Sequence, residues 1–495
     1  MAKSARGALL SNLTLDRNAS ISLTAQLLEY FRRAVLSGEL RPSSRLPSSR
    51  VLAGEMGVAR LTVVNVFEQL VAEGYFVSKI GAGTFVTSFG ATDRVEKQLA
   101  HFKAPKQQQS GSREFSERGD SLIVTQDRSL PVLPQPFTPN MPAFDVFPSN
   151  LWAKLTSRHW RNRPAESLYY GKQGGDPTLK KVIADYLVDA RAIHCDPEQV
   201  IIVAGSQQAI SLCTYLLTDP GDKVWVEDPV PSKPSSIIEG MGADLVFVPT
   251  DSEGIIVSRG LEKAPDARMA LVTPSRQYPL GVTLSLTRRL ELLAWASERG
   301  SWIIEDDYDS EIRFSGRPLP AMKGLDQDDR VIYVGTFSKV LFPSIRLGYL
   351  VVPPDLVEAF TWALELFARG VPSVKQTILA EFIECGHYTS HIRRMRQTYA
   401  ERQEILARVL HSELGGLLTV HKTNAGMNLL ADLPDSISDI AVYHAAFAKG
   451  IIAYPLSYHY VETPSRNALL LGFSHLIPDT IEPNVAILKR AIESL

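Results

Sequence analysis

One lysine in the C-terminal half of the chain stands among residues that suit covalent chemistry with an aldehyde. Lys339 follows Thr336 and Ser338 at the end of a predicted strand, and Arg346 lies seven positions beyond it. A lysine beside hydroxyl groups and a second cation can have a lowered pKa, which favours formation of a Schiff base. Thr336, Ser338 and Arg346 also carry donors that hold a phosphate by charge-assisted hydrogen bonds. The spacing therefore predicts a nucleophilic lysine next to a phosphate site.

Two other segments supply groups that an aldehyde-bearing ring cofactor needs. An apolar run ends in acids and a tyrosine at residues 305–309 (EDDYD), and strand ends are where open α/β sheets bind ligands. There an aspartate can keep a pyridine nitrogen protonated, and a tyrosine can bond a ring oxygen. Residues 204–209 (AGSQQA) lead from a strand into a helix, whose first N–H groups suit a phosphate. Each piece alone is typical of a surface lysine, a helix cap or a helix start, but together they favour pyridoxal phosphate.

These residues lie on a scaffold in which strands and helices alternate. Apolar runs such as residues 200–203 and 302–304 are separated by helical patterns such as residues 284–298. Such alternation predicts an α/β fold with a mostly parallel sheet that is covered on both faces. We expect three parts, namely residues 1–88, a polar linker at 89–135 and a large domain at 136–495.

The first 88 residues are patterned as a helix-turn-helix. Apolar residues recur at helical spacing up to residue 36, and a short helix at 50–56 and a second at 61–73 flank a turn at Gly57. Residues 75–87 follow as a β-hairpin, or wing. The second helix would present Arg60 and Thr62 to base edges, while Arg45 and Arg50 would meet phosphates. The same pattern also fits a small helical cap with surface arginines.

Charge and composition agree with an N-terminal part that contacts nucleic acid. The 495 residues include 52 Lys and Arg against 54 Asp and Glu, so the whole chain is not a general binder of polyanions. Residues 1–90 nevertheless carry ten basic and six acidic side chains, which indicates contact with nucleic acid at that end. The three cysteines share no metal-binding spacing, and neither a secretory leader nor a long apolar span occurs. We therefore expect a cytoplasmic protein with no membrane contact and no metal.

The N-terminal motifs resemble the winged helix of GntR-family bacterial transcription regulators. The resemblance is carried by residues 45–50 (RLPSSR), 57–60 (GVAR), 67–70 (FEQL) and 81–86 (GAGTFV). It implies a winged helix-turn-helix whose DNA contacts fall on Arg50, Arg60, Thr62 and the wing around Gly81. Leu61 departs from the family, which usually has a polar residue there.

The C-terminal part is similar to fold-type I aminotransferases, and the fusion of the two parts resembles the MocR subfamily of regulators. The resemblance implies that Lys339 binds the aldehyde of pyridoxal phosphate, that Asp306 faces the pyridine nitrogen and that Tyr308 faces the ring hydroxyl. Ser206, Gln207, Ser338 and Arg346 would serve the phosphate. Because fold-type I sites are built at a dimer interface, the resemblance also implies a homodimer.

Three departures from the aminotransferase pattern bear on function. Relatives place an aromatic residue over the cofactor ring where this chain has Val230 and Pro231, and they often show His and Thr where it has Arg276 and Leu280. The arginine that clamps a substrate carboxylate is missing from both candidate stretches, residues 458–460 (YHY) and 469–473 (LLLGF). Arg466 and Lys233 are the nearby cations that could substitute for it. Without the clamp, transamination would lack orientation.

The sequence therefore favours a transcription regulator that binds promoter DNA and uses its aminotransferase-like domain as a sensor and not as an enzyme. The departures favour pyridoxal phosphate itself as the signal, as in relatives that govern vitamin B6 synthesis. An adduct of the cofactor with an amine effector, in control of amino acid, GABA or taurine-type metabolism, is one alternative. A working aminotransferase and a mere oligomerisation platform are the others.

Overall fold

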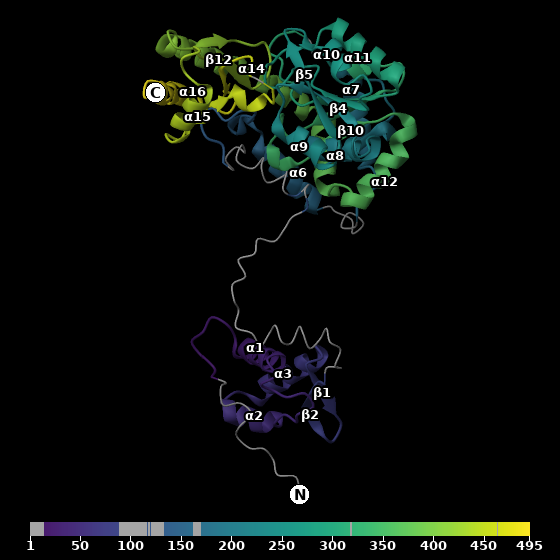
Figure 1. Ribbon diagram of the computed structural model, residues 1–495, viewed down its shortest axis with the longest axis vertical. Coiled ribbons are helices and arrows are strands. Elements are labelled where there is room, and N and C mark those ends of the chain that lie inside the picture. Colours follow the sequence, from purple (N-terminus) through teal and green to yellow (C-terminus); the bar gives the residue numbers. More distant parts are fainter. Residues whose placement is uncertain are drawn as a thin grey trace. The chain divides into compact units, whose positions relative to one another are not determined.

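The computed structural model describes residues 14–88, 116, 119, 133–161, 170–316, 319–462 and 464–495. The chain divides into two compact units, Met1–Glu114 and Phe115–Leu495. Most of the predicted linker at residues 89–135 lies outside the described residues, so its boundaries remain a prediction. Figure 1 shows the elements of each unit.

The N-terminal unit contains a helix-turn-helix and a hairpin. The elements are α1 (Leu23–Leu36), α2 (Ser49–Met56), α3 (Arg60–Ala72), β1 (Phe76–Lys79) and β2 (Gly83–Val86). The Ser48 side chain caps α2 by accepting from the Val51 N–H, and Gly57 ends it with a φ of 63°. Phe31, Phe67 and Phe76 pack edge to face in the core. The predicted elements are confirmed, with ends that shift by one or two residues.

An eight-stranded sheet forms the centre of the second unit. Its strands, in spatial order, are β3 (Val200–Val203), β10 (Gly348–Val351), β9 (Val331–Thr336), β8 (Trp302–Asp307), β7 (Met269–Val272), β4 (Lys223–Asp228), β5 (Asp244–Asp251) and β6 (Gly254–Ile255). The five strands from β9 to β5 are parallel, whereas β10 is antiparallel to both neighbours and β6 is antiparallel to β5. The predicted mostly parallel sheet is confirmed, with β10 as the exception next to the candidate site.

Helices cover both faces of this sheet. The flanking helices are α6 (Ser149–Arg161), α7 (Pro177–Arg191), α8 (Ser206–Leu217), α9 (Ser232–Gly240), α10 (Val257–Lys263), α11 (Leu286–Arg299), α12 (Val357–Ala368) and α13 (Ser373–Glu384). Alternate residues of β3 divide between two cores: Val200 and Ile202 pack with α7 and α13, while Ile201 and Val203 pack with α8 and α12. A strand that is apolar on both faces is therefore buried on both.

The C-terminal residues form a smaller lobe, coloured green to yellow in Figure 1. Its sheet has the order β11 (Thr419–His421), β12 (Asn428–Asp432), β14 (Ala468–Gly472) and β13 (Tyr454–Pro455), all antiparallel. The helices of the lobe are α14 (His387–Leu414), α15 (Asp439–Phe447) and α16 (Pro478–Ile492). Within the described parts of the chain, no helix is both long and apolar enough to span a bilayer.

Candidate cofactor and DNA-binding sites

The sheet register brings three predicted site loops to one edge. Gly348, the first residue of β10, pairs with Val203 at the end of β3 and with Thr336 at the end of β9. A Cβ atom at Gly348 would lie 2.8 Å from the Gly335 carbonyl oxygen and 3.0 Å from the Gly205 Cα, so only glycine allows this close approach. The loops that carry Ser206, Lys339 and Arg346 therefore leave the sheet next to one another.

Lys339 has the electrostatic setting of a nucleophile. Its Nζ donates to the Asn140 carbonyl oxygen at 3.2 Å. Burial lowers the pKa of Lys339 to about 8, and the positive charge of Lys233 acts in the same direction, against the opposing charges of Asp309 and Asp306. A lysine with this pKa has a substantial neutral fraction near neutral pH, as attack on an aldehyde requires.

Asp306 supplies a buried acceptor that has no partner. It lies near the end of β8, in register with Val334 of β9. Among the described residues, none donates a hydrogen bond to its buried Oδ1 atom. Burial, followed by the charge of Asp307, raises the pKa of Asp306 to about 7. An unpaired buried carboxylate oxygen needs a donor, and the protonated nitrogen of a pyridine ring fits that need.

Tyr308 and the predicted phosphate residues surround the same edge. Tyr308 lies after β8, where burial raises its pKa, and its ring meets that of Tyr278 edge to face with centroids 5.9 Å apart. The Thr336 Oγ1 accepts from the Ser338 N–H at 3.3 Å, so Thr336 shapes the loop that holds Lys339.

The start of α8 offers free N–H groups. Gly205 precedes the helix with a φ of 105° and no side-chain cap, which leaves the backbone donors at Ser206 and Gln207 available to an anion. Arg346 is exposed, has a φ of 49° and stands two residues before Gly348. The positions fit a phosphate, while the role of each side chain in holding one remains a prediction.

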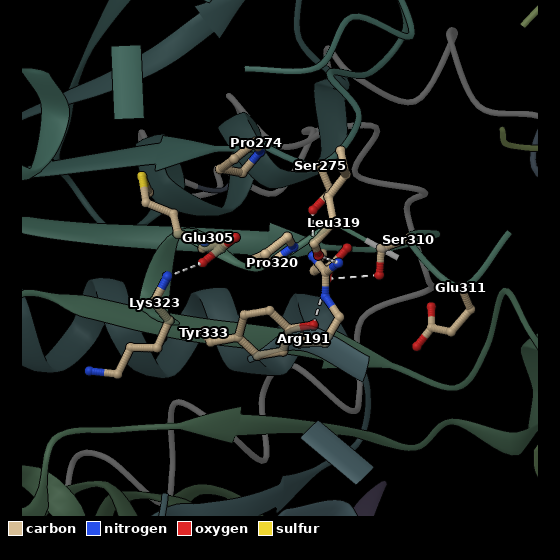
Figure 2. A network of polar contacts seen from close by, with 12 residues as sticks. Arg191, Pro274, Ser275, Glu305, Ser310, Glu311, Leu319, Pro320, Lys323 and Tyr333 are labelled. Atoms are coloured by element: carbon tan, nitrogen blue, oxygen red, sulfur yellow. Dashed lines mark hydrogen bonds and ion pairs between the residues drawn. The ribbon is translucent and has the colours of Figure 1, made fainter. Parts of the chain in front are cut away.

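A buried ionic network holds β8 at Asp307, the residue after Asp306, and Figure 2 shows Arg191, Ser275 and Tyr333 of this network. The Arg191 Nη2 lies 2.6 Å from the Asp307 Oδ2, and the same oxygen accepts from the Tyr333 hydroxyl at 2.5 Å. Arg191 also donates to the Leu319 carbonyl oxygen and to the Ser275 hydroxyl. Because successive side chains of a strand point to opposite faces, this network anchors Asp307 and leaves Asp306 to face the site. Sequence reasoning missed Arg191, since nothing near it in the chain marks it.

The departures from the aminotransferase pattern have structural consequences. Val230 is buried, and its N–H donates to the His459 carbonyl oxygen at 2.9 Å. The guanidinium of Arg276 contacts the carbonyl oxygens of Ala425 and Asn428 and lies 3.5 Å from the Asp309 carboxylate. Arg276 therefore joins the smaller lobe to the loop after β8.

The missing carboxylate clamp is not replaced by Arg466. Both nitrogens of one edge of its guanidinium bind the Asp432 carboxylate, at 2.6 Å and 3.1 Å. Asn428, the first residue of β12, lies near Lys339, because its Nδ2 donates to the side chain of Asn140, whose carbonyl oxygen accepts from Lys339. Asp432 is the last residue of the same strand, and the rise of a strand places it about 13 Å from Asn428. Lys233 stays available: it is exposed at the start of α9, and its charge is felt at Lys339.

The winged helix exposes the predicted DNA-binding residues on its surface. Val63, Val66 and Phe67 bury one side of α3, so Arg60 and Leu61 are exposed at its first turn and Thr62 is half-buried. α3 has no side-chain cap, and the Thr62 N–H donates to the Ala59 carbonyl oxygen at 3.0 Å, so among the described residues the N–H groups of Arg60 and Leu61 are the ones left for a phosphate.

The predicted phosphate contacts lie on neighbouring elements. Arg50 is exposed on α2. The backbone of Arg45 forms an isolated antiparallel β-bridge with Phe85 of β2. Gly81 lies in the hairpin turn with a φ of 74°. Sequence reasoning missed Arg17, whose Nη2 donates to the Gly57 carbonyl oxygen at 2.6 Å and closes the turn between α2 and α3.

Comparisons with known proteins cover both units. Residues 23–86 match the family model of bacterial regulatory proteins of the gntR family, and residues 143–468 match that of class I and II aminotransferases. The chain is 37% identical to the probable rhizopine catabolism regulatory protein MocR of Rhizobium meliloti, over 98% of this chain and 96% of that one. It is 31% identical to the pyridoxine biosynthesis regulator PdxR of Corynebacterium glutamicum, over 97% and 98% of the two chains.

Among solved structures, the chain resembles aminotransferases. Kynurenine aminotransferase of Pyrococcus horikoshii superimposes with a TM-score of 0.67 at 26% identity, over 77% of this chain and 95% of that one. The α-aminoadipate aminotransferase LysN of Thermus thermophilus, solved with a phosphopyridoxyl-leucine adduct, gives 0.66 at 26% identity, over 73% and 92%. The likeness extends to proteins that hold the cofactor predicted for Lys339.

Proposed function

Since the chain belongs to the MocR subfamily of GntR-family regulators, we propose that binding of pyridoxal phosphate beside Lys339 changes how its winged helix binds promoter DNA. Residues 1–88 serve as the DNA-binding domain, residues 89–135 as the linker and residues 136–495 as the effector domain. The observation that carries the proposal is the unpartnered Asp306 oxygen at the same sheet edge as the low-pKa Lys339. Because DNA is its target, we propose that the protein acts in the cytoplasm.

Each predicted residue has a defined task toward the cofactor. When bound, pyridoxal phosphate supplies an aldehyde that captures amines. Lys339 would hold the cofactor through its aldehyde, and Asp306 would accept from the ring nitrogen and keep it protonated. Tyr308 would bond the ring oxygen, and the remaining residues would hold the phosphate, namely Ser206, Gln207, Thr336, Ser338 and Arg346. Burial of the ring among these groups would exclude water from the lysine.

A DNA-binding titration tests the proposal. A fragment selected from random DNA by the full-length protein is titrated with the protein, with and without pyridoxal phosphate. We expect the dissociation constant to change by about 5-fold to 150-fold, as is usual for coupled sites. Lys339→Ala, in parallel, should bind the fragment without responding to the cofactor. Equal affinity of the wild-type protein with and without pyridoxal phosphate, both in the absence and in the presence of an added amine, would overturn the proposal.

The identity of the signal separates two versions of this function. The missing clamp and the 31% identity to PdxR support pyridoxal phosphate alone as the signal, with control of vitamin B6 metabolism. The 37% identity to a probable rhizopine catabolism regulatory protein supports a second effector that acts together with the cofactor, and an amine is the class of molecule that the cofactor aldehyde captures. If the cofactor alone leaves DNA affinity unchanged, and an added amine changes it, the second version holds.

We assign the effector domain a sensor role and not an enzymatic one. Leu470 of β14 is buried in register with Leu430 and Tyr454, in one of the two stretches where aminotransferases carry the clamp. A substrate carboxylate gains no charge partner from that stretch, so repeated turnover would lack orientation. Multiple rounds of transamination with common amino acids would contradict this assignment.

We further propose that the protein acts as a homodimer. Trp362, Leu366 and Phe367 of α12 are 53–69% exposed, and Tyr215 of α8 packs against Phe367. An apolar group of this size on one helix is what a second copy of the chain would bury. Leu366→Glu should lower the mass in sedimentation from two chains to one, whereas Glu365→Gln, on the same helix, should not.

A further inference from the structure

One buried histidine in the larger unit lacks the partners that burial demands. His459 is 7% exposed, and within the described parts of the chain neither its Nδ1 nor its Nε2 has a hydrogen-bond partner. Buried polar side chains are nearly always satisfied, because each unmade hydrogen bond costs about 1–3 kcal/mol. A group of this kind in a wall of a binding site is therefore a candidate for contact with a ligand.

His459 is tied to the cofactor edge by its backbone and by its ring. Its carbonyl oxygen accepts from the N–H of Val230, the residue before Pro231, which stands where aminotransferases carry the stacking aromatic residue. Its ring meets the Tyr278 ring edge to face at 5.1 Å, and Tyr278 in turn meets Tyr308 at 5.9 Å. The Asp228 carboxylate accepts from two backbone N–H groups just beyond the histidine, which fixes this segment on the loop after β4.

The side chains packed around His459 are aromatic and apolar. Tyr454 lies 5.3 Å from the imidazole, ring centroid to centroid, and belongs to a cluster with Leu470 and Leu456. Leu470 stands in the stretch where a clamp arginine was expected. The nearby guanidiniums are already bound, since Arg276 contacts Asp309 and two carbonyl oxygens and Arg466 binds Asp432. Among these side chains, His459 is the polar group without a partner, and the cation that stays available, Lys233, lies on α9 outside this cluster.

The chemistry of the imidazole defines what it can bind. Burial lowers the pKa of His459 to about 4, so the ring is neutral at pH 7, with one N–H donor and one acceptor nitrogen. A neutral ring offers no counter-charge to a carboxylate, and the lone pairs of a carboxylate oppose the acceptor nitrogen. A hydroxyl group donates and accepts, and thus matches a neutral imidazole.

We propose that His459 is a specificity-determining residue that hydrogen-bonds a hydroxyl group of an amine-bearing effector, and that this site takes hydroxylated amines in preference to amino acids. The proposal rests on the version of the proposed function in which an amine effector acts together with the cofactor and binds in front of the cofactor edge. His459 selects the ligand and does not take part in holding the cofactor.

Three matched amines test the preference on the full-length protein loaded with pyridoxal phosphate. The probes are cyclohexylamine, trans-4-aminocyclohexanol and trans-4-aminocyclohexanecarboxylate, which share one ring and differ in one substituent. The change in cofactor absorption with amine concentration gives an apparent dissociation constant for each. We expect the amino alcohol to bind about tenfold more tightly than either other probe, the effect of one hydrogen bond to a buried group.

Variants assign the preference to the imidazole. His459→Phe keeps a ring and removes both nitrogens, so the preference for the hydroxyl should vanish while cyclohexylamine binds as before. His459→Asn keeps a donor and an acceptor and should retain part of the preference. If His459→Phe raises the melting temperature and leaves the order of the three probes unchanged, the histidine is only a structural residue and the proposal is wrong.

The cofactor band separates failure of this proposal from failure of the proposed function. If the wild-type protein gains no absorption band from pyridoxal phosphate, the proposed function itself fails. If the band forms and the carboxylate probe binds as well as the amino alcohol or better, only the assignment of His459 is overturned.

Discussion

At the scale of single residues, burial raises the pKa values of several carboxyl groups in and around the candidate site. Burial is the largest cause that raises the pKa values of Asp306, Asp309 and Glu227 to about 7. The negative charges of Asp306 and Asp309 both act to raise the pKa of Lys339. A cation that enters this site, such as a protonated pyridine ring, would therefore meet groups ready to ionise.

Replacement of Asp306 by Asn should change how the stability of the cofactor-free protein depends on pH. The pKa of Asp306 is raised from 3.8 to about 7, so the folded chain keeps a proton that the unfolded chain releases. Stability therefore falls as the pH rises through this window. For the wild-type protein, this one group should contribute about 1 kcal/mol more stability at pH 6 than at pH 8. Asp306→Asn lacks this contribution.

Urea unfolding at both pH values measures the difference. Asp309 and Glu227 also have pKa values raised to about 7, so the difference between the two proteins reports Asp306 together with its effect on Glu227. Asp355→Asn, at an exposed position before α12, should behave as the wild type. Equal pH dependence in wild-type and Asp306→Asn proteins would show that Asp306 does not hold the proton.

Residues with a local motif could be predicted from the sequence, and residues without one could not. Lys339 and Asp306 follow strand ends in a recognisable order, and the structure places them at one sheet edge. Arg191 and His459 are brought in from remote helices and loops, where their neighbours in the chain give no signal. The bond between Arg466 and Asp432 likewise depends on the pairing of β12 with β14, so the sequence left Arg466 open as a substitute clamp.

At the scale of elements, the ion pair of Arg191 joins the end of α7 to β8 inside the core. Both side chains are 1% exposed, and Tyr333 of β9 donates to the same carboxylate. Arg191→Met leaves Asp307 buried without its cation, which should destabilise the protein by about 3–5 kcal/mol. Urea unfolding measures this loss. Arg259→Ala, which breaks an exposed pair with Glu262, should cost less than about 1 kcal/mol, and equal losses would remove the special role of the buried pair.

The recognition helix gives two distinguishable outcomes for two arginines. Arg60, at the first turn of α3, should read a base, so Arg60→Ala should cost about 1–3 kcal/mol and relax the preference at one position of the operator. Arg50, on α2, should contact a phosphate, so Arg50→Ala should weaken all sequences alike and reduce the salt dependence by about one charge. DNA-binding titrations on an operator and its single-base variants, at several salt concentrations, separate the two.

A basic residue of the other unit provides the control for these titrations. Arg408 is exposed on α14, and Arg408→Ala removes the same charge from the chain. If it weakens DNA binding as much as Arg50→Ala does, a general charge effect explains the result.

The sequence predicts the elements of the winged helix better than the arrangement of the large sheet. Apolar spacing, the Ser48 cap and the Gly57 turn are local signals, and α2 and α3 end within one or two residues of their predicted ends. The placement of β10 between β3 and β9 is not local, since it depends on the close approach of Gly348 to Gly335 and Gly205. This placement brings the site loops together, and the sequence does not predict it.

At the scale of the whole molecule, the division into two units follows from composition. Each unit has its own apolar core, one around Phe31 and Phe67 and the others around the two sheets. The polar stretch between them has too few apolar residues to join those cores. Communication between DNA and cofactor must therefore be measured as a coupling of two binding equilibria.

The coupling must be reciprocal if the regulator works as proposed. If pyridoxal phosphate changes the affinity for the operator by some factor, the operator must change the affinity for pyridoxal phosphate by the same factor, because both paths lead to one ternary complex. A titration of the cofactor band in the presence of saturating operator should therefore reproduce the factor found by DNA titration. DNA of unrelated sequence at the same concentration should give a smaller factor, and Arg60→Ala should shift the cofactor titration back toward that of the DNA-free protein. A cofactor affinity that is indifferent to the operator, in a protein whose DNA affinity does respond to pyridoxal phosphate, would mean that the response arises from a second molecule of the vitamer bound elsewhere and not from Lys339.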